Sequence, residues 1–135
     1  MQQTDCPVIK RMTQEEVDQF YAFGFAQYGA GHLSDAVDTF RVLCTHRPFE
    51  VRFWFGLGAA LQEAKKYEEA LHQWGMTILL KKEDPYPYFH AAECYFSLQN
   101  VAEGGKALKV AEELIAEDHP LKSKISLLRQ QWRLS

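Results

Sequence analysis

The side chains with the clearest potential for chemistry are gathered between residues 90 and 94. His90, Glu93 and Cys94 lie within about one helical turn, and imidazole, carboxylate and thiolate groups are all zinc ligands. A tetrahedral site would need a further ligand from elsewhere in the chain. Cys94 falls at a position expected to be small and buried, and the other two at positions expected to line a groove. We therefore predict no metal site here.

A second candidate is a cysteine nucleophile. Cys44 has His46 nearby in sequence, but helical residues two apart point in different directions, so the histidine is not placed as a base. The three cysteines, Cys6, Cys44 and Cys94, form no metal or redox motif, and their wide spacing favours a reducing compartment. No glycine-rich phosphate loop is present. We predict no enzymatic activity and no cofactor.

Composition limits the remaining classes of function. The chain has 135 residues and a net charge of −3, which fits one domain with a modest core. No cluster of Lys and Arg suggests nucleic-acid binding. No apolar run is long enough for membrane insertion. Residues 1–8 lack the features of a secretory signal, so we predict a cytoplasmic protein.

Three sequence windows share one pattern and begin 34 residues apart, at Val17, Val51 and Pro85. Large residues stand at the fourth and twenty-fourth places, and small residues at the eighth and twentieth. The fourth places are Phe20, Trp54 and Tyr88, and the eighth are Gly24, Gly58 and Ala92. The twentieth places are Ala36, Ala70 and Gly104, and the twenty-fourth are Phe40, Trp74 and Leu108. This pattern is typical of the tetratricopeptide repeat, a pair of antiparallel helices.

The repeat predicts the fold class. Because one helical hairpin cannot bury its apolar face alone, neighbouring hairpins must stack. We predict an all-α, right-handed solenoid with a concave groove. It contains three hairpins, at residues 17–50, 51–84 and 85–118, and a capping helix at about 120–133. The single domain spans residues 13–135, after a flexible N-terminus at residues 1–12. The apolar face of the capping helix carries Leu121, Ile125, Leu128 and Trp132.

Local signals predict where the helices begin and end. Thr13 and Glu16 form a capping box, so the first helix should begin near Gln14 and end at Gly29 to Gly31. Ser34 and Asp35 should open the second helix, and Asp84 with Pro85 the fifth. The other expected helices span 49–64, 67–80 and 101–116. Gly104 and Gly105 interrupt the last of these, either as a hinge or as a tightly packed contact opposite the capping helix.

A second stripe of residues lies on the first helix of each hairpin, at places two, five, nine and twelve. These are Asp18, Tyr21, Phe25 and Tyr28, then Arg52, Phe55, Ala59 and Gln62, then Tyr86, Phe89, Glu93 and Phe96. A helix that is apolar on two sides must bury both or keep one for a partner. The stripe predicts an aromatic, largely uncharged groove that binds an extended apolar peptide. The alternative is packing between repeats or a homodimer face.

The same positions argue against one common function of this repeat. Clamping the acidic C-terminus of a heat-shock chaperone requires Lys at place five and Asn at place nine of the first repeat. Here those places hold Tyr21 and Phe25. We therefore do not expect a carboxylate clamp.

Three segments resemble a particular family more closely than a generic repeat. They are Phe20 to Phe25, Arg52 to Ala59 (Arg-Phe-Trp-Phe-Gly-Leu-Gly-Ala) and Tyr88 to Cys94 (Tyr-Phe-His-Ala-Ala-Glu-Cys), and a fourth, residues 111–115, agrees. They are similar to the class II chaperones of bacterial type III secretion, the SycD/LcrH, IpgC and PcrH group. The resemblance covers about residues 20–115.

The resemblance implies a cytoplasmic chaperone that binds hydrophobic translocator proteins through an N-terminal segment of the Pro-x-Leu-x-x-Pro kind. It also implies homodimers in some relatives, built on an N-terminal helix that the short extension here places in doubt. The positions matching the family's groove are Tyr21, Phe25, Tyr28, Phe55, Ala59, Tyr86, Phe89 and His90. With the stripe, they give the predicted peptide-binding set Tyr21, Phe25, Tyr28, Arg52, Phe55, Ala59, Gln62, Tyr86, Phe89, His90, Glu93 and Phe96.

A second hypothesis is an adaptor of a multiprotein assembly, for example a needle-subunit chaperone or a pilus or division scaffold. An adaptor would use the convex surface or the terminal helices rather than the groove. Substitutions Tyr21→Asp and Phe89→Asp are expected to abolish binding without unfolding only if the groove holds the partner.

Overall fold

The computed structural model describes residues 11–134. These residues form seven α-helices and no strand. The helices are α1 (Gln14–Gly29), α2 (Leu33–His46), α3 (Val51–Glu63), α4 (Tyr67–Leu80), α5 (Pro85–Ser97), α6 (Val101–Glu113) and α7 (Leu121–Gln131). The expectation of an all-α fold is confirmed. None of these helices has the length and apolar character needed to cross a membrane.

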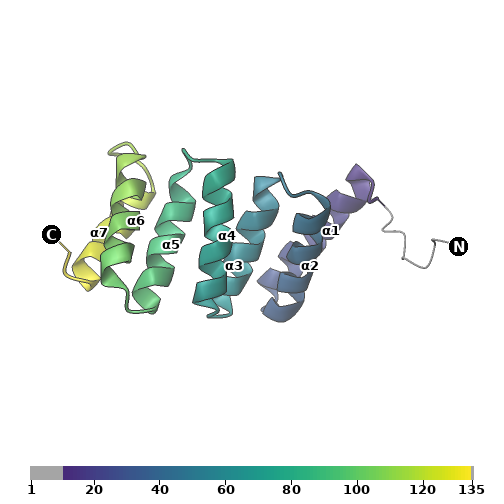
Figure 1. The fold of residues 1–135 in the computed structure, drawn as a ribbon, viewed down its shortest axis with the longest axis horizontal. Helices are drawn as coiled ribbons and strands as arrows, with labels where there is room; N and C mark the ends of the chain where they lie inside the picture. The colour runs from purple at the N-terminus through teal and green to yellow at the C-terminus, as the bar shows by residue number, and fades with distance from the viewer. Residues whose placement is uncertain (1–10, 135) are drawn as a thin grey trace, which may run out of the picture.

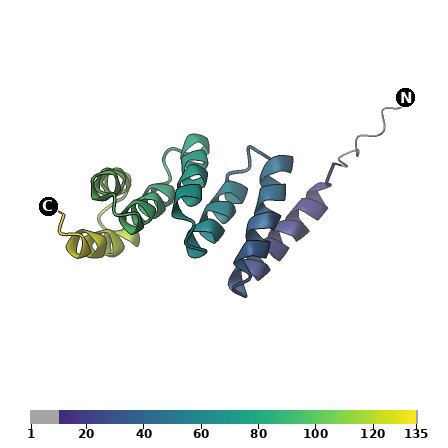
Figure 2. The same ribbon diagram turned by 60° about the horizontal axis from the view of Figure 1, so that its bottom comes forward.

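The helices are arranged as a row of hairpins that follows the order of the chain. Figures 1 and 2 show the pairs α1/α2, α3/α4 and α5/α6 stacked side by side, with α1 and α7 at opposite ends of the row. Each hairpin packs on the next, because α2 contacts α3 and α4 contacts α5. The arrangement is the predicted solenoid of tetratricopeptide hairpins.

Capping residues fix the ends of several helices as expected. Thr13 Oγ1 accepts a hydrogen bond from the backbone N–H of Glu16 at 3.1 Å, and the N–H of Thr13 donates to Glu16 Oε1 at 2.8 Å. After α1, Gly31 adopts φ +82°, the left-handed conformation that glycine tolerates. Asp84 accepts from the N–H of Tyr86 at 3.0 Å and caps α5.

Several predicted helix ends are wrong by one turn or less, and the helix predicted at 49–64 is Val51–Glu63. Helix α2 begins at Leu33, and its N-cap His32 makes no side-chain capping bond, so Ser34 and Asp35 lie inside the helix. Helix α6 ends at Glu113 rather than residue 116. Helix ends depend on local hydrogen bonds that vary by one or two residues without a change in packing.

Contacts between small and large residues hold each hairpin together. A Cβ atom added to Gly24 would lie 3.1 Å from the Phe40 ring, and one added to Gly58 would lie 3.1 Å from the Trp74 ring. These pairs join places eight and twenty-four of the first two repeats, as predicted. Trp74 is fully buried. The two helices approach so closely here that a side chain at Gly58 would press against the Trp74 ring.

Two aromatic residues of the core pattern lie nearer the surface than predicted. Trp54 is half-buried, and its Nε1 donates to the carbonyl of Pro48 at 2.8 Å across the turn before α3. Phe23 stands at place seven of the first repeat, which we expect to face the partner helix together with places four and eight. It is 52% exposed and stacks beside Phe20. The repeat pattern therefore predicts which residues join the two helices of a hairpin, but not how many neighbouring side chains are buried beside them.

The third hairpin is closed by α7. A Cβ atom added to Gly104 would lie 2.5 Å from the Phe96 ring, and Phe96 in turn stacks on Trp132 with centroids 5.1 Å apart and an interplanar angle of 14°. Leu121 and Ile125 are buried in the same cluster. Gly104 is therefore a packed contact rather than a hinge, whereas a Cβ atom on Gly105 would meet only Leu134 at 3.9 Å. Helix α7 is the predicted capping helix.

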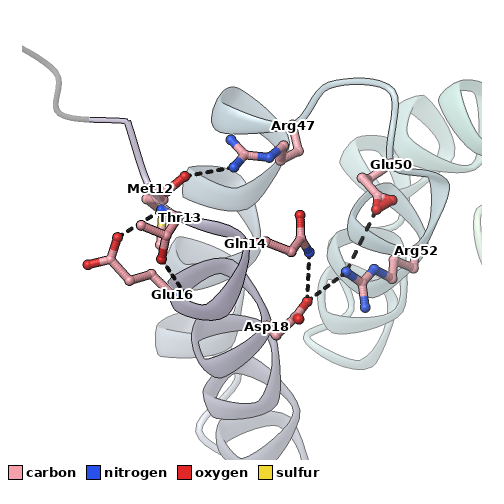
Figure 3. Close-up of polar contacts among 8 residues, drawn as sticks. All are labelled: Met12, Thr13, Gln14, Glu16, Asp18, Arg47, Glu50 and Arg52. Carbon is pink, nitrogen blue, oxygen red and sulfur yellow. Dashed lines mark hydrogen bonds and ion pairs between the residues drawn. The ribbon is translucent and has the colours of Figure 1, made fainter.

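The segment that precedes α1 contacts the first hairpin at Met12. Arg47 Nη2 donates to the backbone carbonyl of Met12 at 2.7 Å (Figure 3), and Met12 also packs against the core. The expected flexibility of residues 1–12 stays a prediction, with Met12 placed in contact with Arg47 and the core. Residues 1–10, on which most of that expectation falls, lie outside the described part of the chain.

Candidate functional site

An apolar pocket lies between α1 and α3 and is completed by the turn before α5. It has a volume of about 250 Å³. Its walls are Tyr21, Phe25, Val51, Arg52, Phe55, Gly56, Lys81 and Asp84. Four of the predicted groove residues, Tyr21, Phe25, Arg52 and Phe55, are thus brought together. The remaining four were missed, because two lie off the stripe on α3 and two come from the loop that follows α4.

Aromatic contacts shape the apolar pocket. The rings of Tyr21 and Phe25 meet edge to face with centroids 4.9 Å apart, and both also contact Phe40 of the core at 6.1 and 5.9 Å. Despite these contacts Phe25 remains 48% exposed. An aromatic side chain that is held in place yet open to solvent offers apolar area to a ligand at little cost in conformational entropy.

Arg52 and Lys81 are the two cations of the apolar pocket, and several groups fix the position of Arg52. Its guanidinium lies 4.7 Å from the Tyr21 ring centroid and 4.8 Å from that of Phe53. It pairs with Asp18 at 3.2 Å and Glu50 at 3.7 Å (Figure 3). Exposed ion pairs add little stability, so their effect here is to orient the guanidinium over the rings.

The pKa of Tyr21 reflects this environment. Burial raises it above its ordinary value, the charge of Arg52 opposes the rise, and the charge of Glu50 adds to it. The Tyr21 hydroxyl is therefore neutral over the physiological range, and the pocket keeps its apolar character. The side chain can pack against an apolar group and still donate one hydrogen bond.

A polar pocket lies between α3 and α5, also with a volume of about 250 Å³. It is lined by Tyr28, Ala59, Gln62, Glu63, Trp74, His90 and Glu93. Five of these residues belong to the predicted set. Glu63 lies one place beyond the stripe, and Trp74 is the large residue at place twenty-four, a position that predicts a core side chain. We use "groove" below for the apolar and polar pockets together.

A chain of hydrogen bonds connects the polar pocket to the core. Trp74 Nε1 donates to Gln62 Oε1 at 2.9 Å, and Gln62 Nε2 donates to Glu93 Oε1 at 3.0 Å. His90 Nδ1 lies 2.8 Å from the same Glu93 oxygen. The Cys94 thiol donates to Gln62 Oε1 at 3.3 Å. The chain joins α3 and α4 of the second hairpin to α5 of the third.

Aromatic rings surround His90. The imidazole stacks on Trp74 with centroids 4.9 Å apart and an interplanar angle of 26°. Phe55, Tyr86 and Phe89 stand at 5.8, 6.5 and 5.6 Å. Because its plane and its Nδ1 are both held, the ring has one orientation in the groove.

Two predicted groove residues are in the core instead. Phe89 is 5% exposed and Phe96 is 1% exposed, and both belong to the cluster with Leu121 and Ile125 of α7. The capping helix covers the side of α5 that in earlier hairpins faces the groove. Tyr86 keeps a half-buried position beside His90 and 5.8 Å from His119.

Cys44 and Cys94, the cysteines of the described residues, are both buried. Burial raises the pKa of the Cys94 thiol to about 12, and it does the same for Cys44. A reactive cysteine needs a lowered pKa and access to solvent. Within residues 11–134, no three His, Cys, Asp or Glu side chains are grouped to hold a metal ion.

Comparison with known proteins places these features in a family. The model of the tetratricopeptide repeat family matches residues 17–48 and 52–84. Low calcium response locus protein H of Yersinia pestis is 33% identical over 110 residues, which are 82% of this chain and 66% of that protein. The chain thus spans slightly less than two thirds of the length of this relative.

Two solved complexes have the same architecture. The type III secretion chaperone SycD of Yersinia enterocolitica, in complex with a peptide of the translocator YopD, is 30% identical with a TM-score of 0.85, covering 93% of this chain and 98% of that one. PcrH of Pseudomonas aeruginosa, in complex with the chaperone binding region of PopD, is 29% identical with a TM-score of 0.85, covering 93% and 97%.

Proposed function

This chain belongs to the tetratricopeptide-repeat chaperones of type III secretion, the family of low calcium response protein H, SycD and PcrH, and we propose that it holds hydrophobic translocator proteins in the cytoplasm before their export. Its ligand is an extended, apolar segment of the translocator that lies in the groove.

One observation carries this proposal: Phe25 is 48% exposed in the wall of the apolar pocket, with its ring in contact with Tyr21 and with Phe40 of the core. Burying an apolar side chain of a ligand there contributes about 1.5–3 kcal/mol. A short segment with two or three such anchors must also lose the entropy of an extended chain. The isolated segment therefore binds no more tightly than about micromolar.

The mechanism is stoichiometric binding rather than catalysis. A translocator has segments that aggregate or enter membranes when they are free. A chaperone that binds the unfolded segment lowers its free concentration in proportion to the chaperone present. This requires no bound nucleotide and no reactive side chain, in keeping with the high pKa values of the buried thiols.

The experiment compares two exposed phenylalanines on α1. Phe25 lines the apolar pocket, whereas Phe23 lies outside both pockets of the groove and stacks on Phe20. Each is replaced by Asp and co-expressed with a translocator of the same bacterium. We expect Phe25→Asp to lose co-purification and to leave the translocator insoluble. Phe23→Asp should retain both, and circular dichroism should show both variants folded.

If folded Phe25→Asp keeps its partner, the groove is not the binding site and the adaptor hypothesis takes precedence. The substitution Phe89→Asp, which the sequence suggested, is a poor test, because Phe89 is buried against α7. A charge there would unfold the third hairpin and remove binding for a reason unrelated to the groove.

A further inference from the structure

The two ring nitrogens of His90, which lines the polar pocket, have different hydrogen-bonding roles: one donates and the other can accept. A carboxylate oxygen only accepts, so the 2.8 Å contact with Glu93 Oε1 requires the proton on His90 Nδ1. In the neutral imidazole the other nitrogen, Nε2, then has a lone pair and is an acceptor. Gln62 donates to the same Glu93 oxygen at 3.0 Å and holds the carboxylate in place.

The acceptor Nε2 is free in the described structure. No hydrogen bond within residues 11–134 involves it, and no buried side-chain nitrogen or oxygen there lacks a partner. Nε2 is therefore accessible to solvent, and His90 is a lining residue of the polar pocket. The stacking of the ring on Trp74 at 4.9 Å sets the direction in which this lone pair points.

An extended ligand needs such an acceptor. When a segment lies in the groove, its main-chain N–H groups lose water and must find partners. The walls of the apolar pocket between α1 and α3 are mainly rings and aliphatic groups. The polar pocket next to it offers Nε2, and also Glu93 Oε2, since both hydrogen bonds to that carboxylate fall on Oε1.

We propose that His90 Nε2 accepts a hydrogen bond from a main-chain N–H of the bound segment, and that Glu93 and Gln62 are positioning residues that keep the ring in the accepting tautomer. This rests on the proposed function, and it assigns to the groove a contact that recognises the extended backbone. The apolar pocket selects the side chain, and His90 fixes the register of the chain beside it.

The probe is a synthetic 15-residue peptide, the tightest binder among overlapping peptides of the co-purifying translocator. A series of its variants replaces one amide at a time by an ester, which removes one N–H. Calorimetry with the unmodified protein should find one position at which the ester weakens binding about tenfold. In His90→Phe, which keeps a ring over Trp74, the amide peptide should bind about tenfold more weakly, and that ester should cost nothing further.

A second measurement tests the positioning residues. Nitrogen NMR of the free protein should show His90 protonated at Nδ1. In Glu93→Ala the proton should move to Nε2, and peptide binding should weaken at least to the level of His90→Phe, because Glu93 Oε2 is removed as well, while the fold remains intact. A purely structural role for Glu93 would leave the tautomer unchanged.

The outcomes separate two failures. If no translocator peptide binds the unmodified protein, the proposed function is wrong and this inference with it. If peptides bind but His90→Phe binds equally well, or if every ester has the same effect in both proteins, the inference alone is overturned. If peptide affinity falls when a lysine of the peptide is replaced by methionine, and no ester changes the affinity, the polar pocket binds a cationic side chain and the inference is overturned.

Discussion

Two adjacent glycines in α6 have opposite surroundings, although the sequence presents them as one pair. Gly104 faces the Phe96 ring. Because this ring is buried and stacked on Trp132, the ring has no room to move away from a side chain at position 104. A Cβ atom on Gly105 would meet only Leu134, at 3.9 Å. The same substitution therefore tests close packing at one position and helix propensity at the other.

Alanine at these positions should change the free energy of unfolding in opposite directions. It improves helix propensity by about 1 kcal/mol at either site, but overpacking against Phe96 costs about 1–3 kcal/mol. We expect Gly105→Ala to stabilise the protein by up to about 1 kcal/mol and Gly104→Ala to destabilise it. Urea denaturation measures both, and equal stabilisation would show that the Phe96 ring can move aside.

The buried thiols should be inert while the protein is folded. In a Cys6→Ser background, Cys44 and Cys94 are the remaining cysteines, and burial raises both pKa values to about 12. We expect slow reaction with Ellman's reagent at pH 8 and fast reaction in urea. Rapid reaction of either thiol in the native protein would contradict the packing around it.

The same thiols predict how stability depends on pH. Unfolding returns each thiol to its ordinary pKa of 9.0. Between about pH 9 and 12 the unfolded chain loses thiol protons that the folded chain keeps. The thiol contribution to the free energy of unfolding is therefore constant below about pH 9 and decreases above it. Replacing both cysteines by alanine should reduce this alkaline decrease in urea melts, and an identical pH profile would argue against it.

At the scale of the helix, α7 is a structural element with one buried and one exposed side. Ile125 is 0% exposed in the cluster of the third hairpin, whereas Leu127 is 57% exposed. We expect Ile125→Ala to cost about 2–5 kcal/mol of unfolding free energy and Leu127→Ala to fall within about 0.5 kcal/mol of the unmodified protein. Thermal melts compare them directly, and a large effect of Leu127→Ala would indicate that its side is covered in solution.

Helix α7 also explains why the sequence placed two buried residues of α5 in the groove. The repeat pattern predicted the helices and the contact of Gly24 with Phe40 because both follow from local spacing. It assigned Phe89 and Phe96 to the groove because it treated the third hairpin like the first two. Whether the groove side of α5 stays exposed depends on where the next helix packs. That packing is a tertiary contact, and the spacing of residues within one repeat does not predict it.

The candidate site was predictable to a similar extent. The stripe on α1 and α3 identified the apolar pocket, since side chains at fixed helical spacing share a face. The hydrogen bonds from Trp74 through Gln62 to Glu93 were not foreseen. These hydrogen bonds join three helices from two hairpins. The repeat pattern places Trp74 in the core and does not predict that its N–H donates to Gln62 of the groove.

At the scale of the whole molecule, the core is divided into two clusters. One includes Val17, Phe40 and Trp74 of the first two hairpins, and the other combines α5 and α6 with α7. In a solenoid each hairpin contacts only its neighbours, so damage at one end weakens the near hairpin first. The two clusters should therefore respond differently to the same substitution.

Hydrogen exchange of Ile125→Ala tests this division. We expect faster amide exchange in α5, α6 and α7, with little change in α1 to α4. Leu127→Ala is the matched control and should leave both regions unchanged. Equal loss of protection along the whole chain would mean that the molecule unfolds as one cooperative unit despite its linear architecture.

The Phe40 ring touches two glycines of successive hairpins, at the positions where Cβ atoms on Gly24 and Gly56 would lie 3.1 and 2.7 Å from it. This contact imposes an order on the changes that a lineage can accumulate. A smaller side chain at position 40 leaves a gap that either glycine can later fill by acquiring a methyl group. In the reverse order, a side chain appears at position 24 or 56 while Phe40 is still present. Its Cβ atom would then overlap the Phe40 ring, and we expect such an intermediate to be selected against. Descendants in which position 24 or 56 has gained a side chain should therefore already have lost the large ring at position 40.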